Sequence, residues 1–195
     1  MITQIAGYLS GIAILLSFIP YARDIFLKKT KPEKMSWFIW AVLGSILFFS
    51  QLAEGAHYSL IMTGVQALGD LFIFVLAIKL GIGGFLKRDI FALICAAISL
   101  FLWYITKNAA IALFIVIFID ATGAILTIIK SYEHPETETV SSWALTSIAG
   151  FMACIAVGKF DLVLLAFPFY TGIITFAIVV SIKLGFIKRN KILTK

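Results

Sequence analysis

Two aspartates stand out because each lies alone within a long, mostly apolar stretch. Neither Asp70 nor Asp120 has a lysine or arginine within two helical turns along the sequence. An ionisable side chain at the centre of a membrane costs about 2.5–3.5 kcal/mol on insertion scales, so each needs a compensating role. An unpaired carboxyl group there favours its neutral form, and it could exchange protons, hold a cation or pair with a cationic substrate group. The alternative is a protonated aspartate that only hydrogen-bonds a neighbouring helix.

A neutral polar residue accompanies the first aspartate. Gln66 lies one helical turn before Asp70 and therefore on the same face of a helix. An amide and a carboxyl group on one face predict either a substrate-binding surface or hydrogen bonds between helices. The second reading is weak in energy, since such bonds contribute about 0.6 kcal/mol on average in membranes.

Two prolines, two tryptophans and a third aspartate are candidate hinge or gate residues. Pro20 and Pro168 interrupt apolar stretches, where each removes one helix hydrogen bond and provides either a hinge or a fixed bend. Trp37 and Trp143 each follow a serine at the start of an apolar stretch, and they are either gating residues or members of an aromatic belt. Asp24 lies beside an arginine near a predicted membrane face, as a gate or capping carboxylate.

The elements that position these residues follow from composition. Apolar residues make up 62% of the 195 positions and charged residues 13%, and the mean hydropathy is +1.06. A water-soluble fold of this length could not bury so much apolar surface. Because a span needs about 20 apolar residues, we expect one all-α membrane unit of seven transmembrane helices: Ile2–Phe26, Met35–Ala53, His57–Leu80, Asp89–Thr106, Asn108–Ile129, Ser141–Gly158 and Phe160–Leu184.

The basic residues predict the orientation of these spans. With the N-terminus outside and the C-terminus inside, fourteen of the 16 lysines and arginines face inward, and only Lys107 and Lys159 face outward. This asymmetry follows the positive-inside rule. It also explains the formal net charge of +6 without a nucleic-acid partner.

The chain contains an internal repeat. The sequence VLAIKLGI of 75–82 returns as VVSIKLGF at 179–186, an offset of 104, and the Ser-Trp pair at 36–37 returns at 142–143, an offset of 106. We therefore expect two three-helix repeats, 1–80 and 108–195 with its basic C-terminal tail, joined by a linker helix within 81–107. With the offset of 104, Tyr170 is the position in the second repeat that corresponds to Gln66 in the first. A midplane site between repeats requires polar groups at such matched positions.

The three-plus-one-plus-three arrangement resembles the PQ-loop superfamily, which includes the SWEET sugar transporters and the lysosomal amino-acid exporters. The residues that carry the resemblance are Pro20-Tyr21, Asp24, Thr30-Lys31-Pro32 and Ser36-Trp37, then Asp120, Lys130-Ser131-Tyr132, Pro135-Glu136 and Ser142-Trp143. It implies a pocket lined from the third and seventh spans, where Gln66 and Tyr170 lie, and a hinge or gate at Pro20 and Tyr21. The sequence departs from the family at the Pro-Gln dipeptide, which is Pro20-Tyr21 in the first half and Leu126-Thr127 in the second, so symmetric hinging is not expected.

These features predict a carrier for a small polar solute that works by alternating access. Gln66, Tyr170, Asp70 and Asp120 would bind substrate, and the two aspartates would also couple protons. The cargo is an amino acid, a sugar or a vitamin-like metabolite, and the lone acids favour proton-linked or amine-bearing cargo. No catalytic triad, phosphate loop or nucleotide fingerprint appears, so we expect no enzyme and no cofactor. The two histidines lie far apart and both cysteines fall inside spans, so no metal site is expected.

Two other classes remain open. A PQ-loop-type membrane receptor would bind a peptide carboxylate, which needs basic residues where this sequence has acids. A structural subunit of a membrane complex, or a homo-oligomer, would show itself by co-purification. The plain N-terminal sequence agrees with a multi-pass protein of a prokaryotic inner membrane.

Overall fold

The computed structural model describes residues 1–28, 32, 34–81 and 87–193. Within these ranges the chain is all-helical, with seven α-helices, a short 3-10 turn and no strand. The elements are α1 (Ile2–Phe26), α2 (Lys34–Ala53), α3 (Leu60–Leu80), α4 (Lys87–Thr106), α5 (Ala109–Glu133), η1 (Pro135–Thr137), α6 (Val140–Val157) and α7 (Leu162–Leu193). Residues 30 and 31 of the predicted Thr30-Lys31-Pro32 motif lie outside the described residues.

Six of these helices are long and apolar enough to cross a membrane. They are α1, α2, α3, α5, α6 and the segment Leu162–Arg189 of α7. In α4 the described apolar segment is shorter, Leu93–Thr106. The chain is therefore a helical, multi-pass integral membrane protein.

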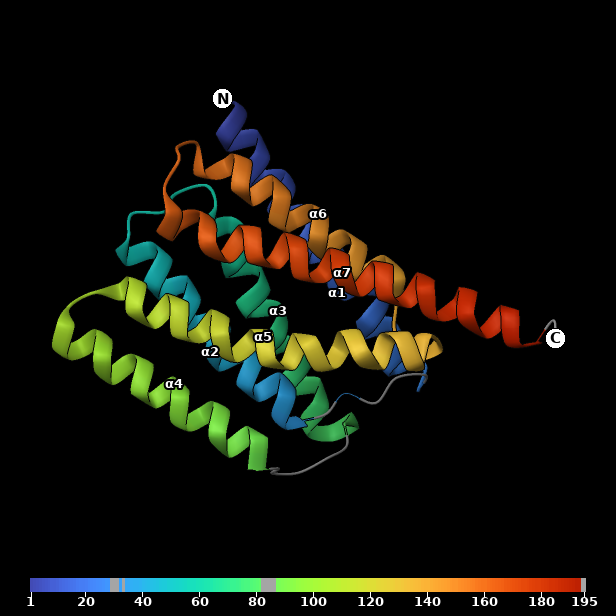
Figure 1. Cartoon of the computed structure of the whole chain (residues 1–195). Coiled ribbons are helices and arrows are strands. Elements are labelled where there is room, and N and C mark those ends of the chain that lie inside the picture. The colour runs from blue at the N-terminus through green and yellow to red at the C-terminus, as the bar shows by residue number, and fades with distance from the viewer. Residues whose placement is uncertain (29–31, 33, 82–86, 194–195) are drawn as a thin grey trace.

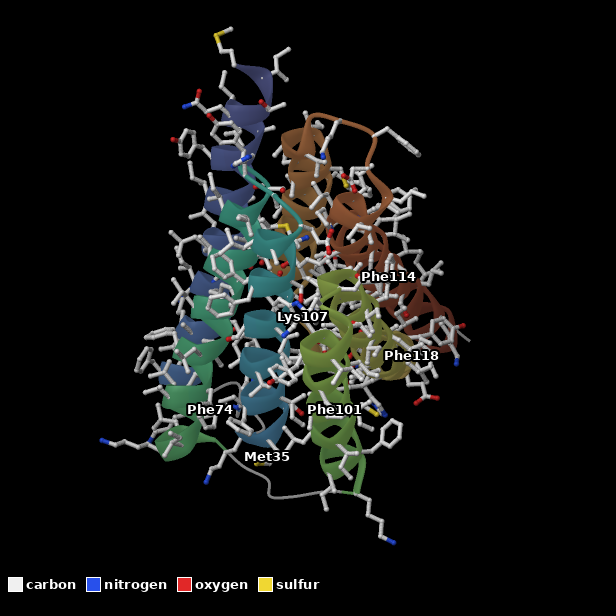
Figure 2. The ribbon with its side chains drawn as sticks, turned by 90° about the vertical axis from the view of Figure 1, so that its left-hand side faces the viewer. Met35, Phe74, Phe101, Lys107, Phe114 and Phe118 are labelled. Atoms are coloured by element: carbon white, nitrogen blue, oxygen red, sulfur yellow. The ribbon has the colours of Figure 1, made fainter. Side chains whose placement is uncertain are left out.

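Large apolar side chains cover the outside of the bundle. Phe118 of α5 is 68% exposed and Phe101 of α4 is 62% exposed, and both point away from the helices that carry them (Figure 2). Comparable exposed leucine, isoleucine and phenylalanine side chains occur on every α-helix. Such a surface is unfavourable in water and fits the hydrocarbon of a membrane.

The two halves of the chain pack in the same pattern. In the first half α3 lies between α1 and α2, and in the second half α7 lies between α5 and α6. Across the halves α1 packs against α6 and α2 packs against α5 (Figure 1). If α1, α2 and α3 are exchanged with α5, α6 and α7, the same set of helix contacts results. α4 lies at one edge of the bundle and contacts α5 and α2.

Glycines allow the helices within each half to approach closely. A Cβ at Gly11 of α1 would lie 2.5 Å from the Ile61 side chain of α3, and a Cβ at Gly150 of α6 would lie 2.5 Å from the Gly172 backbone nitrogen of α7. Membrane helices associate largely through such close packing, since lipid supplies no hydrophobic force between them. These contacts fix how each helix is rotated toward the core.

Helix ends depart from the sequence-based bounds by three residues or more at three places. α3 begins at Leu60 instead of His57 because residues 54–59 form a turn in which Gly55 has a φ of +80°. α5 continues to Glu133, and α7 continues to Leu193, nine residues beyond the predicted Leu184. The last turns of α7 extend past the other helices (Figure 1) and are held there by an ion pair between Arg189 and Glu136.

Candidate functional site

A hydrogen bond joins two of the predicted site residues. The Tyr170 hydroxyl of α7 donates to Asp120 Oδ2 of α5 at 2.6 Å. Both side chains are largely enclosed, because α5 and α7 pack side by side. A short bond to a carboxyl group in apolar surroundings is strong, so the tyrosine fixes the position of this acid.

The second predicted acid lies on a helix of the first half. Asp70 of α3 is 7% exposed and lies near enough to Asp120 for two negative charges to repel. Its Oδ2 atom lies 3.6 Å from the point where a Cβ on Gly44 of α2 would be. The glycine therefore leaves space for the carboxyl group between α2 and α3. One acid from each half of the chain is therefore enclosed in the same apolar bundle, on helices that do not pack against each other.

Gln66 contributes an acceptor on the same helix as Asp70. Its Oε1 atom is buried and has no hydrogen-bond partner among the described residues. A buried amide oxygen without a partner costs about 1–3 kcal/mol. This is therefore a position where a ligand group or a water molecule would be stabilising.

A surface groove lies elsewhere on the molecule. It has a volume of about 290 Å³ and is lined by Leu100, Trp103, Tyr104 and Lys107 of α4 and the residue that follows it. None of the predicted site residues lines it. The cluster of Asp70, Asp120 and Tyr170 is packed among helices, so the predicted chamber between the halves stays a prediction.

Aromatic side chains form one cluster at the end of α1 and the start of α2. The ring centroids of Trp37 and Tyr21 lie 5.0 Å apart. Trp40 meets Trp37 edge to face at 5.1 Å, and Phe18 lies at 6.4 Å. Trp37 is buried, so it is a packed residue and does not project into lipid as a belt residue would.

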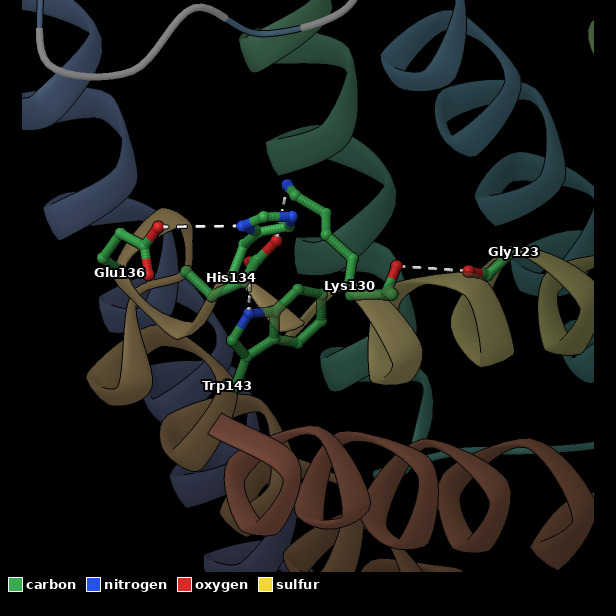
Figure 3. Close-up of polar contacts among 7 residues, drawn as sticks. Gly123, Lys130, His134, Glu136 and Trp143 are labelled. Carbon is green, nitrogen blue, oxygen red and sulfur yellow. Dashed lines mark hydrogen bonds and ion pairs between the residues drawn. The ribbon is translucent and has the colours of Figure 1, made fainter. Parts of the chain in front are cut away.

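The matching region of the second half is polar. Glu138, which precedes α6, accepts hydrogen bonds from Trp143 Nε1 at 2.9 Å and from Lys130 Nζ at 3.0 Å (Figure 3). The carboxylate therefore ties the end of α5 to the start of α6. Glu138 also lies near enough to Tyr21 of the first half to act on it electrostatically. This cluster, with Trp37, brings together three of the predicted gate residues.

The remaining predicted hinge and gate residues, Pro20, Pro168 and Asp24, do not belong to these two clusters. α1 continues through Pro20, and α7 continues through Pro168. The Pro168 carbonyl oxygen lies against Gly150, 2.9 Å from where a Cβ there would be, so the backbones of α6 and α7 meet at this proline. Asp24 is partly buried near the end of α1 and has no hydrogen bond or ion pair with a described residue.

Sequence reasoning missed polar contacts near the other end of the bundle. Glu54, just after α2, accepts a hydrogen bond from the Ala110 backbone N–H of α5 at 3.1 Å, alongside the Asn108 cap. Thr63 of α3 donates to Gln51 Oε1 of α2 at 2.6 Å, with both side chains buried. Charged and polar residues near span ends are common, so nothing in the sequence marks these pairs.

No group of three or more potential metal ligands occurs in the part of the chain that the structure describes. No family model, curated protein or solved structure matches this chain. The functional argument therefore depends on the geometry of the polar residues.

Proposed function

We propose that this protein is a transmembrane carrier that moves a small polar solute by alternating access, with Asp70 and Asp120 coupling transport to protons. The observation that carries the proposal is the enclosure of polar groups from both halves inside the apolar bundle. Tyr170 donates to Asp120 at 2.6 Å, and Asp70 of the first half is 7% exposed. A purely structural bundle gains little from two enclosed acids, because each is costly to place there.

The packing pattern supports the finer topology that we propose. Seven spans with the N-terminus outside would let both three-helix units share one orientation, with α4 as the linker. The equivalent contacts of α1, α2 and α3 and of α5, α6 and α7 are those expected of duplicated units related by an axis along the membrane normal. We further propose that the chain is related to the PQ-loop superfamily and lies in a prokaryotic inner membrane.

Contacts between the two halves, at the two ends of the bundle, would open and close during transport. In the proposed orientation, Glu54 and Ala110 close the outer side, as does the approach of Gly158, which caps the end of α6, to Thr3 of α1. On the inner side, Glu138 of the second half lies near Tyr21 of the first. Rocking of the two units would open one set of contacts while the other stays closed, with the acids alternately exposed.

The direct test is uptake into liposomes that contain the purified protein. A panel of sugars, amino acids, amines and vitamins is offered with and without a pH gradient. We expect at least one solute to accumulate, and we expect Asp70→Asn and Asp120→Asn to abolish the pH dependence. Asp161→Asn is the matched control, since this acid lies outside the bundle and caps α7. A folded protein that moves no solute, or aspartate variants with unchanged pH dependence, would contradict the proposal.

A further inference from the structure

A row of polar side chains runs along one face of α3 up to Asp70. Ser59, Thr63 and Gln66 precede Asp70 by eleven, seven and four residues, a spacing that places them on one face of the helix. The row faces α2, because Thr63 donates to Gln51 Oε1 at 2.6 Å. Eleven residues of helix span about 16 Å, which is half of a membrane core of about 30 Å. In the proposed orientation this outer row joins the outer end of α3 to the depth of its acid.

A second row runs along α5 in the opposite direction from its acid. Thr127 and Ser131 follow Asp120 by seven and eleven residues, again on one face of the helix. This face meets α7, where Tyr170 donates to Asp120 and a Cβ on Gly185 would lie 3.0 Å from the Ser131 carbonyl oxygen. In the proposed orientation α3 and α5 both run from the outer to the inner side, so this inner row leads inward.

Apolar side chains close the other side of each acid. Three residues after Asp70, toward the inner side, Ile73 is fully buried in the aromatic cluster at the start of α2. Seven and four residues before Asp120, toward the outer side, Leu113 and Val116 are fully buried in the main core. Each acid therefore has polar side chains on one side along its helix and packed hydrocarbon on the other.

Both rows contain buried polar atoms without a partner. Among the described residues nothing hydrogen-bonds Ser59 Oγ or Gln66 Oε1 in the outer row, Gln51 Nε2 beside it, or Ser131 Oγ in the inner row. The side chains of Gln51, Ser59 and Ser131 are at most 1% exposed. Buried polar groups of this kind are unfavourable alone, and inside proteins they bind ordered water. Both rows can therefore hold water molecules between their side chains.

We propose that the two rows are separate proton routes, so that Asp70 exchanges protons with the outer side and Asp120 with the inner side. The inference rests on the proposed proton coupling and names the side that each acid serves. Membrane transporters carry protons along such chains of polar and acidic groups. Each step breaks one O–H bond of a water molecule or hydroxyl group and forms another, and the last O–H bond forms on the carboxylate. Because neither route passes its acid, protons cross only when the carrier changes conformation.

Few ionisable groups face the two acids. From α1, α2 and α6, which pack against α3, no ionisable side chain of the described residues hydrogen-bonds Asp70, and the charge that acts on it is that of Asp120. From α2, α4, α7 and η1, which pack against α5, the described ionisable side chain that hydrogen-bonds Asp120 is Tyr170. Proton exchange at each acid therefore reports on the row that leads to it.

Hydrogen–deuterium exchange of the two carboxyl groups tests the inference. The full-length protein in lipid bilayers is held in acid, where both groups are protonated, and is then transferred to D2O. Infrared spectroscopy follows the C=O band of each protonated acid, and Asp70→Asn and Asp120→Asn assign the bands. The probe is the deuteron itself, so no solute has to be identified.

Ser59→Ala and Ser131→Ala are matched variants. Both serines are buried and their hydroxyl groups have no partner among the described residues, so neither change removes a hydrogen bond that holds the fold. We expect Ser59→Ala to slow exchange at Asp70 about tenfold and to leave Asp120 unchanged. Ser131→Ala should have the opposite effect. Ser99→Ala, at a buried serine of α4 that lies in neither row, should change neither rate.

Thr63→Val and Thr127→Val form a second pair in case a serine variant does not fold. Each removes a hydroxyl group seven residues from its acid and keeps the shape of the side chain. We expect the same selectivity, with Thr63→Val acting on Asp70 and Thr127→Val on Asp120. Variants that slow exchange equally at both acids, or that leave both rates unchanged, overturn the inference.

Failure of this inference is distinguishable from failure of the carrier function. Selective slowing of exchange in a protein that moves no solute in liposomes leaves the routes standing and removes the carrier. Uptake that depends on pH, in a protein whose serine variants exchange like the wild type, leaves the carrier standing and removes the routes.

Discussion

Tyr170 and Asp120 lie 50 positions apart in the sequence, on α7 and α5, yet their side chains are joined by a hydrogen bond of 2.6 Å. The bond gives the acid a fixed donor, and Asp70 of the other half lies near enough for the two charges to interact. Asp120 is therefore held in position while Asp70, which has no such donor among the described residues, is available to a ligand.

Removing the tyrosine hydroxyl tests this asymmetry. Tyr170→Phe deletes the donor to Asp120 and keeps the ring, so the fold should survive with a loss of about 1 kcal/mol. Uptake at low substrate concentration should fall about tenfold, because the acid is no longer fixed and a hydrogen bond to a charged group contributes about 1.5–3 kcal/mol. Tyr8→Phe, on an exposed ring of α1, is the control. Unchanged uptake in Tyr170→Phe would remove this bond from the mechanism.

Two glycines of the second half provide a matched test of packing. At Gly150 a new Cβ would lie 2.5 Å from the Gly172 nitrogen and 2.9 Å from the Pro168 oxygen, whereas at Gly123 it would meet nothing within 4 Å. We expect Gly150→Ala to destabilise the protein by about 1–3 kcal/mol, because backbone atoms of α7 must move. Gly123→Ala should be neutral or stabilising by up to about 1 kcal/mol. Thermal unfolding in detergent measures both, and equal melting temperatures would contradict the α6–α7 contact.

The positions of the helices could be read from the sequence because a membrane requires long apolar segments. The predicted bounds of α1 agree with the structure, and those of α2 differ by one residue. The apolar pattern did not predict where α7 ends, because basic residues begin at Lys183 and continue to Lys191. Lysine and arginine are good helix formers, and Arg189 pairs with Glu136, so the helix continues where the apolar segment stops.

The candidate site could be predicted only in part. Asp70, Asp120 and Gln66 are conspicuous because polar residues are rare in apolar segments. The bond between Tyr170 and Asp120 could not be predicted, since it depends on how α5 and α7 rotate about their axes when they pack. Glu138 lies eight residues after Lys130 and five before Trp143, a spacing that places no two of them on one helical face.

The contact of Glu54 with α5 should control access from the outer side in the proposed orientation. Glu54→Ala removes the acceptor of the Ala110 N–H, which Asn108 still caps. Loss of about 1 kcal/mol from the closed state should speed labelling of a cysteine placed at the buried Ser50, one turn earlier, about fivefold. The measurement uses a methanethiosulfonate reagent in a background without the native cysteines. Glu54→Gln keeps an acceptor and should label more slowly than Glu54→Ala, whereas identical rates would exclude this role.

We expect Asp161, which lies outside the membrane-spanning helices, to make the free energy of unfolding depend on pH. A hydrogen bond from Lys159 and the N–H groups of Leu164 and Val163 lower the pKa of Asp161 below its ordinary value of 3.8. A lowered pKa in the folded state means that the stabilisation is present above about pH 4 and is lost as the pH falls through the folded value. Asp161→Asn keeps the capping oxygen but not the charge. Its melting temperature should therefore lie below that of the wild type at neutral pH and meet it in acid, and a constant difference would contradict this assignment.

The two glutamates beside α6 form ion pairs that differ in how exposed the acid is. The Glu138 side chain is 14% exposed and holds Lys130 and Trp143, whereas the Glu136 side chain is 48% exposed and pairs with Arg189. Glu138→Gln removes the charged acceptor of Lys130 and Trp143 and should cost about 1–2 kcal/mol, since water still reaches the Lys130 ammonium group, whose side chain is 54% exposed. Glu136→Gln should cost less than about 1 kcal/mol, and its effect should vanish in high salt. Thermal unfolding with and without added salt measures both. Equal losses would mean that Glu138 does not hold α5 to α6, and that the inner side of the bundle is closed by aromatic packing alone.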